Sequence, residues 1–197
     1  MCSSIARAAL LGSLLLGLPA AAVAQSDSER PSTVTLFGSF GLAHNFSSFD
    51  VDVPGLDRNG AGGQVRIMWQ PGQLLSAGLE VGRTHVYSIT RPAAGGGEVH
   101  QTLDAVPILA VFGMSPAKHF TVNFGTGFAN NTSSVTLLDS RASSSALGAV
   151  YMASTMYLLP LSPKISLGGE LRYLRLAKYE DNTLSLQITL AWTLSSK

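Results

Sequence analysis

The 197-residue chain is poor in cysteine and in charged residues. Its single cysteine is Cys2, so the rest of the chain cannot form internal disulfides, thiolate metal sites or cysteine nucleophiles. Charged residues make up 13% of the sequence, against about 25% in an ordinary soluble domain. The formal net charge is +1, which excludes the strongly basic surface that nucleic-acid binding requires.

Long apolar runs are also scarce. After Ala24 no run of 18 apolar residues occurs, so the sequence predicts no membrane-spanning helix there. Residues 1–24 are predicted to be a cleaved signal peptide, with Arg7 in the positive region and a short apolar run over residues 8–18. An uncleaved N-terminal anchor is the alternative, but the run is about half the length of a spanning helix. Residues 25–197 are expected to form one domain.

The dominant pattern that is present has a period of two. In residues 184–194 (LSLQITLAWTL), apolar side chains occupy one face and small or polar side chains the other. This stretch is longer than the usual soluble strand of about 5–6 residues and matches the roughly 9–11 residues of a tilted membrane strand. The same alternation, less regular in the first and sixth segments, predicts eight strands. They cover residues 33–46, 63–69, 75–83, 102–114, 120–128, 147–159, 165–173 and 184–194.

The fourth predicted strand, residues 102–114, fits this pattern least well. Residues 106–112 are apolar on both faces, and Pro107 cannot donate a ladder hydrogen bond. A closed barrel has no edge strand where a proline would do no harm. We therefore expect a β-bulge near Pro107.

The connections between predicted strands alternate in length. Those near residues 71–73, 115–118 and 160–164 are short and contain proline, and the one near 180–182 is also short. Three segments rich in Gly, Ser, Asp or Asn are predicted to be long loops: residues 45–59, 90–99 and 130–145. Short turns at one end and long loops at the other are typical of outer-membrane barrels. We therefore expect the long loops to face outward and both termini to lie in the periplasm.

The fold expected from these patterns is all-β: a closed antiparallel up-and-down transmembrane β-barrel of eight strands. In a bilayer every backbone N–H and C=O needs a partner, so the strands must close on themselves. The apolar faces would meet lipid, because an Arg facing lipid at the midplane costs about 2–4 kcal/mol. The alternative is a soluble lipocalin-like binder with its faces reversed, but the polar faces contain too few Lys and Glu for a solvated surface.

Polar residues on the predicted inner faces are the candidate site. Side chains fill the interior of an eight-stranded barrel, and buried charges need partners, so we expect a structural network in preference to an ion pathway. The network residues are Arg66, Glu80, Asn123, Glu170, Arg172 and Gln187. Aromatic residues near the strand ends are expected to form two interfacial girdles. These are Trp69, Phe120, Tyr157 and Trp192 toward the short turns, and Phe46, Tyr87, Phe128 and Tyr173 toward the long loops.

Over residues 33–194 the chain resembles the small bacterial outer-membrane protein β-barrel domain family, which includes OmpA-type and OmpW-type barrels. The resemblance rests on the export signal, the alternating strands, the segment FGTGFANN (residues 124–131) and the last strand. Such barrels usually end in an aromatic residue that the barrel assembly machinery reads during insertion. Here the last aromatic residue is Trp192, and five further residues follow it.

The resemblance also raises one enzymatic option, since some small outer-membrane barrels are lipid A deacylases that use Ser, His and an acid. His85 and Ser88 are the nearest local pair, but they lie on opposite faces of a strand. No histidine pair has the spacing of metal ligands. We therefore expect no enzyme activity, no catalytic residues, no metal and no cofactor.

The sequence leaves two candidate functions. The first is a structural or surface-interaction role through the outward loops, with outer-membrane lipid and lipopolysaccharide as partners. The second is a narrow pore or carrier for small, apolar molecules.

Overall fold

A computed structural model describes residues 32–46, 54–72, 74–92, 97–137, 140–178 and 181–196. The predicted signal peptide, residues 1–24, lies outside the described residues and stays a prediction. The elements are β1 (Thr33–Phe46), β2 (Leu56–Asp57), β3 (Asn59–Gln70), β4 (Leu75–Pro92), β5 (Glu98–Ala117), β6 (Phe120–Leu137), β7 (Ser140–Pro160), β8 (Ile165–Leu176) and β9 (Asp181–Ser196). Within these ranges no helix is long and apolar enough to cross a membrane.

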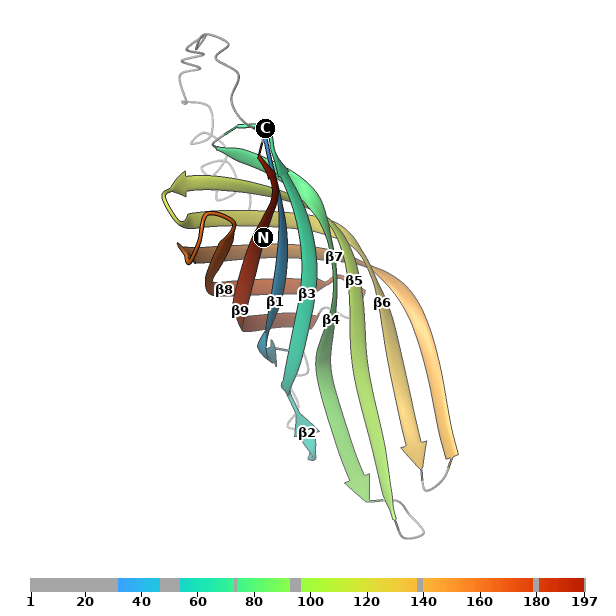
Figure 1. Cartoon of the computed structure of the whole chain (residues 1–197). Helices are drawn as coiled ribbons and strands as arrows, with labels where there is room; N and C mark the ends of the chain where they lie inside the picture. The colour runs from blue at the N-terminus through green and yellow to red at the C-terminus, as the bar shows by residue number, and fades with distance from the viewer. Residues whose placement is uncertain are drawn as a thin grey trace, which may run out of the picture.

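Eight of the strands form a closed antiparallel ring (Figure 1). Their order is β4-β3-β1-β9-β8-β7-β6-β5, and β5 pairs again with β4. The two-residue strand β2 adds to β4 outside the ring. A path that starts at Leu36 of β1 and moves from each residue to its paired neighbour passes once around the ring. It returns to β1 at Phe46, ten residues farther along the chain. This stagger corresponds to strands tilted by about 40°. The predicted eight-stranded up-and-down barrel is confirmed.

The alternation decides which face points outward. On β9, Leu186 is 67% exposed, while its neighbour Gln187 is 3% exposed. Large apolar side chains on each of the other ring strands also stand exposed outside the ring, among them Phe40, Leu79 and Ile108. The lipocalin-like alternative, which needed the apolar faces inside, is therefore wrong. The two tryptophans, Trp69 and Trp192, are half exposed on the outer wall.

The barrel has two different ends. We call one the turn end, because it has the short connections β3–β4, β5–β6 and β7–β8. Thr33 and Ser196 pair there as neighbours. We call the other the hairpin end. There β4 to β7 run well past the ends of β1, β3, β8 and β9 (Figure 1).

The prediction of a long loop over residues 130–145 is wrong. β6 and β7 stay in register from Asn130 opposite Leu147 to Leu137 opposite Ser140. The loop predicted over residues 90–99 is also shorter, because the β4–β5 pairing continues to Pro92 opposite Glu98. Ser, Thr and Asn are common in loops, but antiparallel pairing satisfies the backbone of such residues equally well. Long hairpins therefore replace two of the three expected loops.

The expected bulge at Pro107 is also wrong. Pro107 pairs in register with Ala129 of β6. On the other side the β4–β5 ladder is interrupted at Gly82 and Arg83, and its register is unchanged when pairing resumes at Thr84 opposite Ala105. The missing N–H of Pro107 therefore leaves a local gap in the β4–β5 ladder, and no extra residue is inserted as a bulge there. The bulge lies between His85 and Tyr87 instead. Tyr87 is expected in the aromatic girdle toward the long loops. In the structure its side chain is partly buried and packs against the buried apolar cluster inside the barrel.

The interior also contains apolar side chains. A buried apolar cluster lies inside the barrel and draws on strands β3 to β8. It includes Leu103, Ala105, Leu109 and Val111 of β5, whose opposite face turns Ile108 and Phe112 outward. This agrees with the sequence, in which residues 106–112 are apolar on both faces. β5 is apolar on both faces because it meets lipid on one side and this cluster on the other.

Candidate functional site

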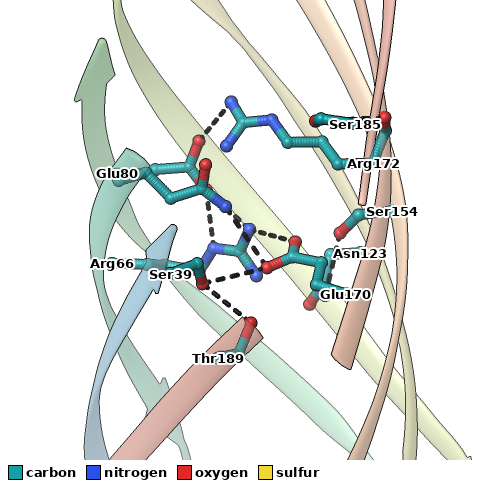
Figure 2. A network of polar contacts seen from close by, with 10 residues as sticks. Ser39, Arg66, Glu80, Asn123, Ser154, Glu170, Arg172, Ser185 and Thr189 are labelled. Atoms are coloured by element: carbon teal, nitrogen blue, oxygen red, sulfur yellow. Dashed lines mark hydrogen bonds and ion pairs between the residues drawn. The ribbon is translucent and has the colours of Figure 1, made fainter. Parts of the chain in front are cut away.

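Four charged side chains cross the interior as one ionic chain (Figure 2). An Arg66 terminal nitrogen lies 2.6 Å from Glu80 Oε2 and 2.7 Å from Glu170 Oε1. Arg66 Nε also donates to Glu80 Oε2 at 2.7 Å. Arg172 completes the chain with a contact of 2.6 Å to Glu80 Oε1. The order is therefore Arg172, Glu80, Arg66, Glu170, in which each charge touches only opposite charges.

Register explains why these residues meet. Arg66 of β3 stands directly opposite Glu80 of β4, and both point inward. Glu170 and Arg172 share the inner face of β8, because residues two apart in a strand point to the same side. The narrow ring then places β8 across from β3 and β4. All four side chains are at most 3% exposed.

Neutral polar groups hold the Glu170 end of this chain in place. Ser39 Oγ donates to Glu170 Oε2 at 3.3 Å and lies 2.9 Å from Thr189 Oγ1. Gln64 Nε2 donates to the same Glu170 oxygen at 3.2 Å. Donors from Ser39, Gln64 and Arg66 therefore all serve one carboxylate, which suits a buried negative charge.

The other two candidate residues are buried but are not links in the ionic chain. Asn123 Nδ2 donates to Ser154 Oγ at 3.3 Å (Figure 2). Gln187 stands opposite Glu170 in the β8–β9 ladder, and its Oε1 has no hydrogen-bond partner in the described part of the chain. The six residues thus gather in one interior, with four in direct ionic contact.

Sequence reasoning did not single out Ser39, Gln64, Ser154 or Thr189. Gln64 and Thr189 share the inner faces of their strands with candidate residues, so the period of two could have identified them. Ser39 and Ser154 lie on β1 and β7, the two strands with the least regular alternation. The sequence contains no comparable signal for these two residues.

A cavity lies in the interior on the turn side of the ionic chain. Its volume is about 180 Å³, and Arg66 and Asn123 are in its wall. Toward the hairpin end the filling is mixed: Leu174 and Leu176 of β8 and Val86 of β4 belong to the apolar cluster, whereas Asn131 and Thr183 are buried polar residues. The ionic chain and the apolar cluster therefore stand between this cavity and the hairpin end.

A second polar cluster lies on the outer wall toward the hairpin end. His85 Nδ1 lies 2.9 Å from Asp104 Oδ1, and an Arg83 nitrogen lies 3.0 Å from Asp104 Oδ2. The structure therefore pairs His85 with Asp104, while Ser88 stands opposite Asp57 and Thr102. Among the described residues no group of three or more His, Cys, Asp or Glu could hold a metal ion.

Asp181 lies beyond the hairpin end of the apolar surface on β9, which begins at Leu184. Its side chain points inward and is almost completely buried. Burial raises the pKa of Asp181 to about 6, because removal from water disfavours the charged carboxylate.

The chain is similar to one protein family and to several solved structures. A family model described as the outer membrane protein beta-barrel domain matches residues 9–193. No curated protein sequence matches the chain significantly.

Three solved structures share the fold at low sequence identity. One is Ail, the attachment invasion locus protein of Yersinia pestis, in complex with the heparin analogue sucrose octasulfate, at a TM-score of 0.58 and 8% identity. That match covers 84% of this chain and 99% of Ail. Neisserial surface protein A has a TM-score of 0.54 and 14% identity, over 82% of this chain and 97% of its own. A major outer membrane protein of Thermus thermophilus has a TM-score of 0.53 and 15% identity, over 83% of this chain and 99% of its own.

Proposed function

Because this chain belongs to the outer membrane protein beta-barrel domain family, we propose that it is a closed barrel of the bacterial outer membrane with a surface-interaction role. The observation that carries this proposal is the four-stranded extension of β4 to β7 at the hairpin end (Figure 1). A barrel that only spanned the membrane would not need strands of 18 to 21 residues, since roughly 9–11 are enough.

The extension offers an open strand edge. β8 pairs with β7 from Val150 onward, so within the described residues no strand covers the β8 side of residues 140–148. Residues 140–145 of this segment are also exposed. Unpaired backbone N–H and C=O groups along an edge can add a strand from another chain. On the other side of the extension, β2 covers part of β4.

The filled interior supports a scaffold over a pore. The ionic chain crosses the barrel, and the apolar cluster occupies the interior beyond it. Ions would have to displace buried pairs that are held by several hydrogen bonds, which is costly. The cavity of about 180 Å³ on the turn side is the one observation that favours the second candidate, a narrow pore or carrier.

The proposed orientation places the turn end in the periplasm and the hairpin end outside the cell. It follows from the distribution of connection lengths, because outer-membrane barrels have short periplasmic turns and longer outer segments. The first residue of β1, Thr33, and the last residue of β9, Ser196, would then be periplasmic.

Cysteine labelling on intact cells tests the orientation. We would introduce Ser143→Cys in the exposed β7 edge and, as the matched control, Gly72→Cys in a short turn where an added Cβ meets no atom within 4 Å. A membrane-impermeant maleimide should label position 143 on intact cells and position 72 only after the outer membrane is opened. The reverse pattern would refute the surface role.

Planar-bilayer conductance tests the closed barrel. The purified protein should give no regular unitary steps, because its interior is filled. Reproducible steps that disappear when the protein is boiled would favour the pore over the scaffold.

A further inference from the structure

A groove lies on the outer wall where β9, β1, β3 and β4 run side by side. Its volume is about 760 Å³, and it is lined by outward apolar side chains that include Phe40, Val65 and Ile188. Gly38 and Gly63 form a notch between them, because neither has a side chain. An added Cβ at Gly38 would meet no atom within 4 Å, whereas one at Gly63 would lie 3.3 Å from the Phe40 ring, so the open part of the notch is at Gly38.

One cation stands at the hairpin side of this groove. On β4 the outward apolar residues Leu79 and Val81 are followed by Arg83, which lines the groove. On the neighbouring β5 the outward apolar residues end at Asp104, the ion-pair partner of Arg83. Arg83 therefore lies at the boundary between the apolar wall and the polar hairpin end.

Arg83 has donors available for an anion even while one of its nitrogens contacts Asp104. Its side chain is 74% exposed, and the guanidinium group has five N–H donors in a planar fork. Asp104 also contacts His85 at 2.9 Å, so its charge is shared between two partners. We expect Asp104 to orient the guanidinium group and leave its outer donors available.

We propose that this groove binds one molecule of lipopolysaccharide, with an acyl chain in the Gly38–Gly63 notch and a lipid A phosphate on Arg83. An apolar groove in the lipid-facing wall favours an acyl chain, and a guanidinium group at its polar end favours a phosphate through charge-assisted hydrogen bonds. The choice of lipopolysaccharide over phospholipid rests on the orientation proposed above, which places Arg83 in the outer leaflet.

The test is lipid binding to the purified, delipidated full-length barrel, measured by native mass spectrometry. The probes are rough lipopolysaccharide, the same molecule after removal of its phosphates, and phosphatidylglycerol. Arg83→Gln removes the cation, and Gly38→Leu fills the notch with an apolar side chain. The matched controls are Lys164→Gln, a cation at the turn end, and Ala110→Leu, an exposed outer-wall position on β5.

We expect Arg83→Gln and Gly38→Leu each to weaken lipopolysaccharide binding by about tenfold, and both controls to bind like the unmodified protein. Arg83→Gln should make no difference with the dephosphorylated lipid, whereas Gly38→Leu should still weaken its binding. Unchanged binding by both variants would overturn the proposal. Equal competition by phosphatidylglycerol would overturn lipopolysaccharide as the occupant.

The result of the lipid-binding test can be distinguished from the result of the cysteine-labelling test of the proposed function. Binding in detergent does not depend on the direction in which the barrel is inserted, so a failure here leaves the surface role standing. If cysteine labelling instead reverses the orientation, Arg83 would face the inner leaflet, and the assignment to lipopolysaccharide would fail even with binding intact.

Discussion

At the scale of single residues, Arg66 is the centre of the barrel interior. It contacts both glutamates of the ionic chain, while Arg172 contacts one of them. Two arginines and two glutamates cancel in charge, which allows all four to be buried in one place. Sequence alternation alone placed these residues on inner faces. It could not say which of them meet, because that depends on how the strands are staggered around the ring.

Glu170→Ala should destabilise the barrel strongly. The substitution leaves Arg66 with one ionic partner and removes the acceptor for Ser39 and Gln64. Breaking a buried ion pair from one side costs about 3–5 kcal/mol, since the remaining charge stays buried. The free energy of unfolding would be measured by urea titration in lipid vesicles, with gel mobility of the unboiled protein as the readout of folding.

The control for this substitution is Glu98→Ala, which removes an exposed carboxylate at the hairpin end. It should change the unfolding free energy by less than about 0.5 kcal/mol. If Glu170→Ala is as stable as this control and conducts ions, the network is a gate and not a structural support.

At the scale of elements, β5 shows where sequence reasoning was limited. The period of two predicted its position, but Val106 to Phe112 gave no clue to which face points inward. The answer depends on tertiary structure, because an apolar side chain suits both lipid and the buried cluster. For strands with charges, such as β3 and β8, one face was plainly unsuitable for lipid, and the predicted orientation was correct.

The hairpin extension is the second element that the sequence did not predict. Residues 130–145 contain many Ser, Thr and Asn, a composition that predicts a loop, but β6 and β7 pair along this whole segment. Strand pairing is a relation between two segments, so the composition of one segment cannot establish it. The strand starts at the turn end, by contrast, were predicted well: Leu75, Phe120 and Ile165 are each the first residue of their strand.

Shortening the β6–β7 hairpin should leave the barrel folded. We would delete residues 134–143 and join Ser133 to Ser144 through Asn-Gly, which forms a two-residue hairpin turn. No residue of the ionic chain or the buried cluster is removed. The heat-dependent shift in gel mobility should therefore persist in purified outer membranes.

The comparison for this deletion is an equally long deletion of residues 147–156, which removes Val150, Met152 and Met156 from the interior. That variant should lose the folded band. A barrel that also fails to fold without residues 134–143 would show that the extension is part of the folding core.

At the scale of the whole molecule, the barrel presents an apolar outer wall around a mixed interior. The family match agrees with this arrangement, which suits lipid outside and buried pairs within. The only two tryptophans of the chain, Trp69 and Trp192, stand on this wall toward the turn end, and they are 53% and 51% exposed. They therefore report directly on contact with lipid.

Brominated phospholipids should quench the tryptophan fluorescence of the reconstituted barrel strongly. Bromine placed near the headgroup should quench more than bromine near the bilayer centre, because both rings lie toward one end of the wall. Protein unfolded in urea beside the same vesicles is the control and should retain its fluorescence. Equal fluorescence in brominated and ordinary lipid would contradict a lipid-facing wall.

The seam between β1 and β9 has a consequence for how the protein forms. Ser39 and Thr189 touch across it, although they are 150 residues apart in the chain. Contacts at such separation form slowly, since a long segment must lose its freedom before they can stabilise anything. The ring cannot close until the final strand has been synthesised and exported. Until then the first strand has an uncovered edge that can pair with any neighbouring chain, and each molecule is at risk of aggregation until its own last strand arrives.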